Sequence, residues 1–284
     1  MNVGIMSYLE IYKKAFAELK KCYPAAFFTC AIGILLTSGL HQLKEYLYRT
    51  TAVCAGHNIS LLLILLLVYL AASIGVYFWS DVIFAGEAKF FMQAKSGKIN
   101  VRNLFWFVSG RGNAVKVLWR KYIHIFLATL MLIIPGVIVS YDLMLVPYML
   151  CDVPEMPKDR AVKISESAME GYKWKCFVML LPFYAITVPE LIIAVILKEN
   201  MIAVYVVLYI ISSIVKPVQL AVMQEFYEFM NGRILAAAID INEEERQTEY
   251  TVTEEVIEVY STGDDEHNNR ILTVSSDDLT GKRM

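Results

Sequence analysis

Residues 59–80 constrain the fold of this chain most, because the stretch is almost entirely apolar and contains no charged residue. An α-helix rises 1.5 Å per residue, so twenty or so residues cover a hydrocarbon core of about 30 Å. The stretch therefore predicts a transmembrane helix. The composition agrees, since 57% of the residues are hydrophobic and 19% are charged, a balance that favours a membrane protein over a soluble domain.

Further apolar runs predict an all-α, polytopic helical membrane bundle of about six membrane segments. An amphipathic helix at residues 3–21 precedes them, with apolar residues at steps of three and four and lysines toward its end, as in helices that lie at the membrane interface. A polar loop follows the first segment at residues 41–58. The predicted segments are residues 24–40, 59–80, 115–134, 137–150, 176–197 and 201–223.

The run from 115 to 150 is interrupted at Pro135-Gly136, which leaves two interpretations, one long kinked helix or a hairpin of two short segments that turns at this pair. A hairpin returns the five Lys and Arg residues of 151–175 to the side that holds the strongly basic stretch 87–121. Because basic residues concentrate on the cytoplasmic side, this distribution favours the hairpin and places both termini in the cytoplasm.

Two amphipathic or charged regions complete the chain. Residues 158–173 predict a surface helix with one apolar face, balanced in charge and therefore suited to docking on protein. The net charge is +6 over residues 1–240, the predicted helical membrane domain, and −8 over residues 241–284. Low hydrophobicity and high charge predict that this acidic cytoplasmic tail is disordered.

No pattern of catalytic or metal-binding residues stands out. The four histidines share no ligand spacing, and the five cysteines lack CxxC spacing, so we expect no catalytic site, no metal and no cofactor. The mixture of basic and aromatic residues at 87–121 fits anionic headgroups better than nucleic acid, because it lies between two predicted spans. Charges at membrane depth usually face a cavity or one another, and Asp142 and Lys216 are the deepest by sequence. They are a candidate intramembrane polar pair, and the alternative is that the Lys216 side chain extends to the inner surface of the membrane instead.

The central stretch of the chain carries a family signature. It consists of Pro135, Gly136, Tyr141, Pro147, Asp152, Pro154, Ala161, Ser165, Met169, Gly171, Lys173 and Phe177. On these residues the chain resembles a bacterial family of integral membrane proteins known as domain of unknown function nine-seven-five, related to the membrane domain beside some glycerophosphodiester phosphodiesterases. The resemblance implies a membrane architecture but no activity, and the chain has no room for a phosphodiesterase barrel.

These observations predict a non-enzymatic accessory or scaffold protein of the bacterial cytoplasmic (inner) membrane. Its expected partners are the lipid bilayer and another membrane or envelope protein, contacted through the surface helices or the acidic tail, and not nucleic acid. One alternative is a small-solute or ion transporter or channel built around Asp142 and Lys216. A membrane-embedded lipid-modifying enzyme is a third hypothesis, weakened by the lack of a catalytic cluster.

Overall fold

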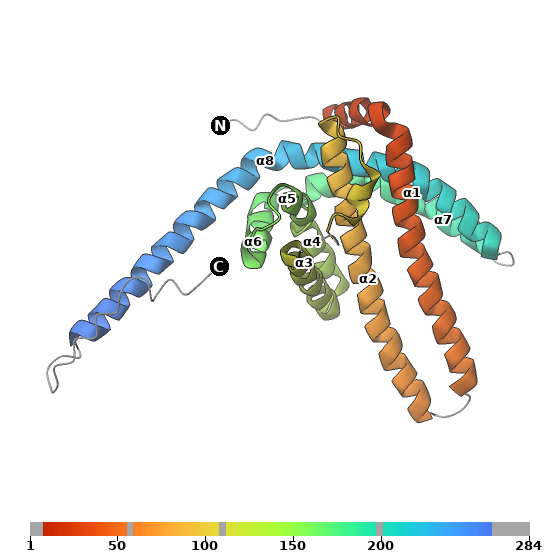
Figure 1. Ribbon diagram of the computed structural model, residues 1–284, viewed down its shortest axis with the longest axis horizontal. Helices are drawn as coiled ribbons and strands as arrows, with labels where there is room; N and C mark the ends of the chain where they lie inside the picture. The colour runs from red at the N-terminus through yellow and green to blue at the C-terminus, as the bar shows by residue number, and fades with distance from the viewer. Residues whose placement is uncertain (1–7, 56–58, 108–111, 197–200, 263–284) are drawn as a thin grey trace. The chain divides into compact units, whose positions relative to one another are not determined.

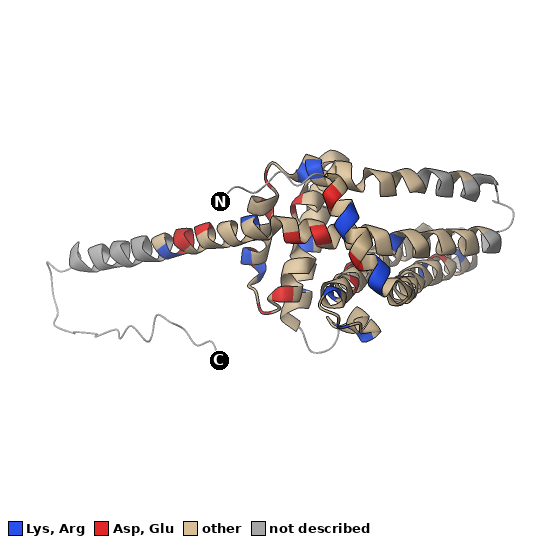
Figure 2. Ribbon diagram, turned by 90° about the horizontal axis from the view of Figure 1, so that it is seen from above, with Lys and Arg blue, Asp and Glu red and all other residues tan. Residues whose placement is uncertain are grey.

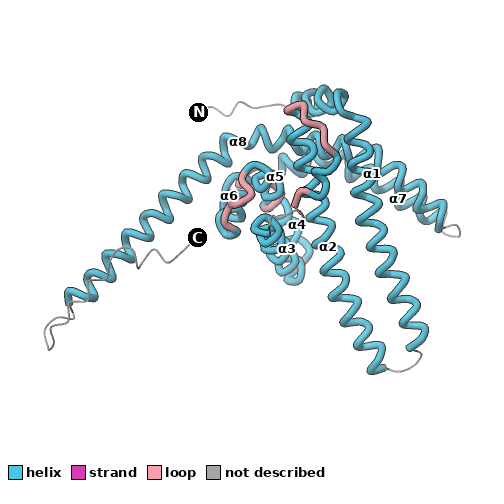
Figure 3. Tube along the Cα trace, in the orientation of Figure 1, coloured by secondary structure: helices cyan, strands magenta, loops and turns pink. Residues whose placement is uncertain are grey.

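The computed structural model describes residues 8–55, 59–107, 112–196 and 201–262, and nearly all of them are helical. Figure 3 shows helices joined by short loops, with no strand in these ranges. The prediction of an all-α fold is therefore confirmed. The elements of the described ranges are α1 (Tyr8–Ala55), α2 (Ile59–Lys95), the 3-10 helix η1 (Val101–Phe105), α3 (Gly112–Met131), α4 (Ile133–Asp142), α5 (Val146–Asp152), α6 (Lys158–Met169), α7 (Lys173–Ile196) and α8 (Met201–Thr262).

A single helix, α1, occupies the region where we predicted an interfacial helix at 3–21, a span at 24–40 and a polar loop at 41–58. Pro24 lies inside this helix instead of separating two elements. A proline removes one backbone hydrogen bond, but the helix can continue through it with a bend. Figure 1 shows such a turn in the N-terminal part of α1, drawn in red. Residues 3–7 and 56–58 of these predictions lie outside the described residues.

The helices α1 and α2 form an antiparallel pair, which Figure 1 shows side by side. His41 packs against Tyr77 with ring centroids 5.0 Å apart, and the Lys44 ammonium donates to the Ser73 hydroxyl at 3.0 Å. Further along, the Tyr69 hydroxyl donates to the Glu45 carboxylate at 2.5 Å. Residues 41–55 thus lie along the apolar part of α2, where the sequence had suggested a loop.

The chain reverses direction between α3 and α4. Leu132 has an extended backbone, with φ −163° and ψ 149°, and separates the two helices. At the other end of α3, the Asn113 amide donates to the carbonyl oxygens of Pro154 and Met156 at 3.1 and 2.9 Å. A continuous helix would hold Asn113 and Pro154 about 60 Å apart. The hairpin interpretation is therefore correct, although the turn falls at Leu132 and not at Pro135-Gly136.

The turn occurs before Pro135 because a proline fits the first turn of a helix, where its missing N–H is not needed. Gly136 then allows the two legs of the hairpin to approach closely. A Cβ atom at this position would lie 2.8 Å from the Cα of Thr129 on α3.

The core forms around α5, in which Val146 to Cys151 are all buried. The C-terminal part of α2 is also buried, and there η1 approaches the helix so closely that a Cβ on Gly86 would lie 2.1 Å from the Leu104 carbonyl oxygen. The predicted surface helix is α6, which ends four residues earlier than expected because Gly171 has a φ of +77°. Its apolar face packs inward, and Arg233 of α8 donates to the carbonyl oxygen of Ala168 at 3.1 Å.

Within the described residues, four helical stretches are long and apolar enough to cross a membrane: Tyr8–Val53, Ile59–Lys95, Ile133–Asp152 and Val204–Gln247. The prediction of six segments is thus corrected to four in this part of the chain. The segment 137–150 falls within one of these stretches and 201–223 overlaps another from Val204 onward, whereas 115–134 and 176–197 are not among them. The helix α3 is not among these stretches because it carries three cations, Lys116, Arg120 and Lys121. Most side chains of α7 beyond residue 186 lie outside the described part.

The chain divides into two compact units between Ala238 and Ile239. Residues 241–262, which we expected to be disordered, are the helical end of α8. Glutamate, arginine and glutamine are good helix formers, and residues 243–247 consist of these three types. The rest of the predicted tail, residues 263–284, lies outside the described residues.

Candidate functional site

The most buried charge in the described part of the chain belongs to Glu87 on α2, which has no exposed surface. Its carboxylate oxygen Oε1 lies 2.7 Å from the ammonium nitrogen of Lys216 on α8. Gly33 on α1 makes room for this carboxylate, since a Cβ there would lie 2.2 Å from Oε1. The site therefore joins three helices, α1, α2 and α8, around one ion pair.

Further polar atoms in the core have no hydrogen-bond partner among the described residues. One is the second oxygen of the same carboxylate, Glu87 Oε2. The hydroxyls of Ser213, one turn before Lys216 on α8, and of Tyr148 on α5 are also buried and unpaired. An unpaired buried polar atom is costly and therefore marks a strained or functional position. These atoms make the Glu87–Lys216 pair the strongest candidate site in the described chain.

A second ion pair connects α4 to α7. The Lys173 ammonium lies 2.7 Å from Oδ1 and 2.9 Å from Oδ2 of Asp142. The Ser165 hydroxyl of α6 donates to the Asp142 backbone carbonyl at 2.5 Å. Asp142 is buried, so these contacts compensate for the loss of its hydration. Three helices, α4, α6 and α7, are thereby held together around Asp142.

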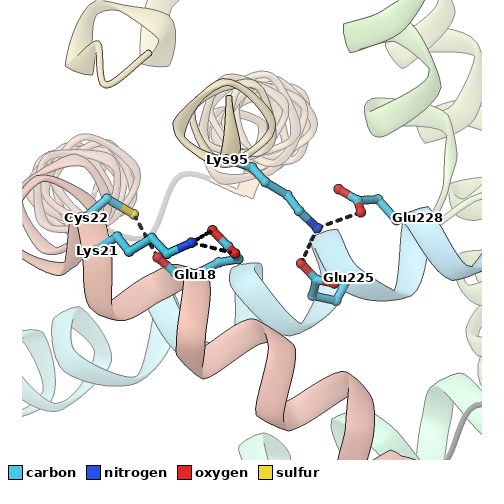
Figure 4. A network of polar contacts seen from close by, with 6 residues as sticks. All are labelled: Glu18, Lys21, Cys22, Lys95, Glu225 and Glu228. Carbon is cyan, nitrogen blue, oxygen red and sulfur yellow. Dashed lines mark hydrogen bonds and ion pairs between the residues drawn. The ribbon is translucent and has the colours of Figure 1, made fainter. Parts of the chain in front are cut away.

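Two further ion-pair clusters connect α2 to its neighbours. Lys121 on α3 is buried and lies 3.2 Å from Asp81 on α2. At the end of α2, the Lys95 ammonium lies 2.5 Å from Glu225 and 2.6 Å from Glu228, both on α8 (Figure 4). Figure 2 shows the charged residues gathered where the helices meet, while long stretches of helix carry none.

The predicted pair of Asp142 and Lys216 is not formed. Asp142 pairs with Lys173, and Lys216 pairs with Glu87. Sequence depth placed both residues well inside apolar runs, but it did not show which helices face each other. Glu87 was missed because it is the single acid at the start of a basic stretch, and Lys173 because it ends an amphipathic surface helix. The small neighbours Gly86 and Ala88 were an available signal for close packing around Glu87.

Half of the family-signature residues are buried, and two of the twelve contact Asp142. Ser165 and Lys173 both contact Asp142, as described above. Asp152 accepts a hydrogen bond of 2.6 Å from the Tyr227 hydroxyl of α8. The remaining members have structural roles. Pro135 and Gly136 form the first turn of α4, Pro147 begins α5, Pro154 accepts a hydrogen bond from Asn113, Ala161 and Met169 are buried on α6, and Gly171 ends that helix. Tyr141 contacts Tyr184 and packs edge-on against Phe177, with ring centroids 6.2 Å apart.

The helices also form a polar cavity and an apolar groove. A polar cavity of about 330 Å³ is lined by side chains of α2, α5 and α8, among them Lys89, Asp152 and Glu228. An apolar groove of about 410 Å³ lies along α1 and α2, with Leu43, Tyr69 and Val76 in its walls. The described residues contain no group of three or more His, Cys, Asp and Glu residues that could hold a metal ion. The chemistry these sites offer is charge pairing and hydrogen bonding.

The fold and the buried charges define a class of helical protein with helices that could span a membrane and with ion pairs where those helices meet. The chain belongs to the family described as protein of unknown function (DUF975), which matches residues 25–233. This range includes every residue of the four ion-pair clusters described above. No curated protein and no solved structure matches the chain.

Proposed function

We propose that this chain is a non-enzymatic accessory or scaffold protein of the bacterial cytoplasmic membrane, with both termini in the cytoplasm. The observation that carries the proposal is the use of its buried charges. Glu87, Asp142, Lys121 and Glu225 are buried, and each binds a residue of another helix and so fastens two helices together. A residue that holds two helices together in this way cannot bind and release a transported solute without weakening the contact between those helices.

Exposed apolar surface supports the membrane location. In α2 the most apolar stretch of 18 residues contains no buried residue. Apolar patches of this extent are rare on soluble monomers and are typical of surfaces that face lipid or another protein. We propose lipid as the main contact of this surface, and a membrane or envelope protein as the partner of α6 or of the acidic C-terminal region.

A flux measurement tests the proposal. Purified full-length protein is reconstituted into proteoliposomes that contain pyranine, and proton entry is followed after a pH jump, with sodium and potassium dyes in parallel. We expect wild-type and Glu87→Gln vesicles to be as impermeable as protein-free vesicles. Flux that requires wild-type Glu87 would contradict the scaffold.

One observation favours transport as the second candidate. Glu87 Oε2 is buried and has no hydrogen-bond partner in the described part of the chain, and it adjoins a lysine that is partly exposed. Such an oxygen could accept a proton or a cation in transit. In this case Glu87→Gln abolishes flux and leaves thermal stability unchanged. In a scaffold, the same change lowers stability and there is no flux to lose.

A further inference from the structure

The tip of the α3–α4 hairpin is an exposed apolar end. Residues 130–134 are Leu, Met, Leu, Ile and Ile, and their exposed fractions run from 68% to 83%. Five consecutive large apolar side chains do not remain in water without a partner. The five side chains of this tip therefore need contact with another apolar medium.

The charged residues at its two ends mark the length of the hairpin. Residues 122–141 contain no Lys, Arg, Asp or Glu, and they lie between Lys121 and Asp142, which pair with Asp81 and Lys173. The turn at Leu132 divides this uncharged stretch into two legs of about ten residues each. Ten helical residues extend about 15 Å, which is half of a hydrocarbon core of about 30 Å.

Aromatic residues place the base of both legs at a membrane interface. Just before the first leg on α3, Trp119 is exposed and packs on Phe78 with ring centroids 4.9 Å apart, beside the Lys121–Asp81 pair. At the end of the second leg, Asp142 pairs with Lys173 of α7, and the next residue of α7, Trp174, is exposed. Tryptophan beside cations is typical of the boundary between headgroups and hydrocarbon.

The α1–α2 pair provides a comparison within the same molecule. From Asp81 back to Ile59, α2 continues for 22 residues without a further charge, which is about 33 Å and enough to cross the core. The facing part of α1 carries charges, but Lys44 and Glu45 contact Ser73 and Tyr69 of α2. Asp81 on α2 pairs with Lys121 on α3. The α1–α2 hairpin and the α3–α4 hairpin therefore start at the same depth, and the α3–α4 hairpin is about half as long as the α1–α2 hairpin.

The backbone hydrogen bonds of the turn are compatible with a hydrocarbon environment. The N–H of Leu132 donates to the Ala128 carbonyl at 3.2 Å, and the N–H of Gly136 donates to the Leu132 carbonyl at 3.3 Å. Pro135 has no N–H to satisfy, and the Thr129 hydroxyl donates to the Ile125 carbonyl at 2.7 Å. Each of these features reduces the number of polar backbone groups that would face lipid.

We propose that residues 122–141 form a re-entrant hairpin, whose tip at residues 130–134 ends inside the hydrocarbon core and binds lipid acyl chains. α3 and α4 then enter and leave the bilayer from the same side. This inference rests on the proposed membrane location. It adds to that proposal a segment that enters the bilayer without crossing it.

Cysteine labelling of the full chain in bacterial membranes tests the hairpin. A cysteine-free variant, checked for wild-type thermal stability, receives one cysteine at the tip (Leu132→Cys, or Ile133→Cys as a second choice). Thr51→Cys near the end of α1 and Glu155→Cys at the hairpin base are the controls. A membrane-impermeant maleimide is applied to spheroplasts and to inverted vesicles, and a fluorophore on each cysteine is then quenched by lipids that carry a spin label at a shallow or a deep acyl position.

We expect the tip cysteine to resist the maleimide from both sides, to react after denaturation in SDS, and to be quenched most by the deep label. Position 51 should react from outside and position 155 from inside. A tip that reacts from outside would show a crossing hairpin, and a protected tip without quenching would show a protein cover; either result overturns the proposal. If alkaline carbonate releases the protein from membranes, the proposed location itself fails, and that result is independent of the tip labelling.

Discussion

Asp142 and Lys173 show how a single charge in this chain depends on its partner. The carboxylate is buried and the lysine is partly exposed, so the pair is intermediate between a surface ion pair, with about 0–1 kcal/mol, and a buried pair, whose disruption costs about 3–5 kcal/mol. We expect Lys173→Met to lower the free energy of unfolding by about 2 kcal/mol, measured as a shift of the thermal midpoint in detergent.

The matched control for this change is Arg120→Gln. Arg120 pairs with Asp159 at 2.9 Å, but both side chains are exposed. Its removal should cost less than about 1 kcal/mol, because water solvates the remaining carboxylate. Equal losses from the two variants would mean that the burial of Asp142 has no energetic effect.

Sequence reasoning identified Asp142 and Lys216 as buried charges that need partners, but it joined them to each other. The number of residues between a charge and the end of an apolar run gives its depth along a helix. It does not give the helix face or the neighbouring helix, and both partners, Glu87 and Lys173, came from stretches interpreted as surface. The exposure of a residue depends on tertiary packing, which periodicity alone does not determine.

At the scale of elements, glycines in α2 distinguish packed from open positions. A Cβ at Gly86 meets the Leu104 carbonyl of η1 at 2.1 Å, whereas nothing lies within 4 Å of a Cβ at Gly75 on the same helix. We expect Gly86→Ala to lower stability by about 1–3 kcal/mol through overpacking. Gly75→Ala should be neutral or slightly stabilising, because alanine favours helix. Thermal unfolding of the two variants side by side measures the difference, and an equally stable Gly86→Ala variant would contradict the close contact of η1 with α2.

The hairpin shows what could be predicted for an element. Its existence followed from the distribution of basic residues, and the structure confirms it. Its turn was misplaced by three residues, because proline and glycine were interpreted as breakers although proline also suits a helix start. Pro24 in α1 is the opposite case, because a proline expected to separate two elements lies within one longer helix.

At the scale of the whole molecule, the second compact unit begins at Ile239. We expect a chain that ends after Gln247 to insert into membranes and to keep the thermal midpoint of the full-length protein, because the cut leaves every ion pair described above intact. The cut lies beyond Ile241 because that residue is buried. Aggregation or degradation of the shortened chain, with stable full-length protein as control, would show that residues 248–284 support the folded body.

The central claim is that buried charges fasten helices together, and a double-mutant cycle on Glu87 and Lys216 in detergent tests it most directly. Breaking a buried pair costs about 3–5 kcal/mol, or roughly 5–8 °C in the thermal midpoint of a chain of this size. We expect Glu87→Gln and Lys216→Met each to cause such a loss and the double variant to lose much less than their sum. The control cycle of Asp142→Asn with Lys216→Met should be additive, since these residues have different partners. Single variants with unchanged midpoints, or an additive Glu87–Lys216 cycle, would contradict the claim.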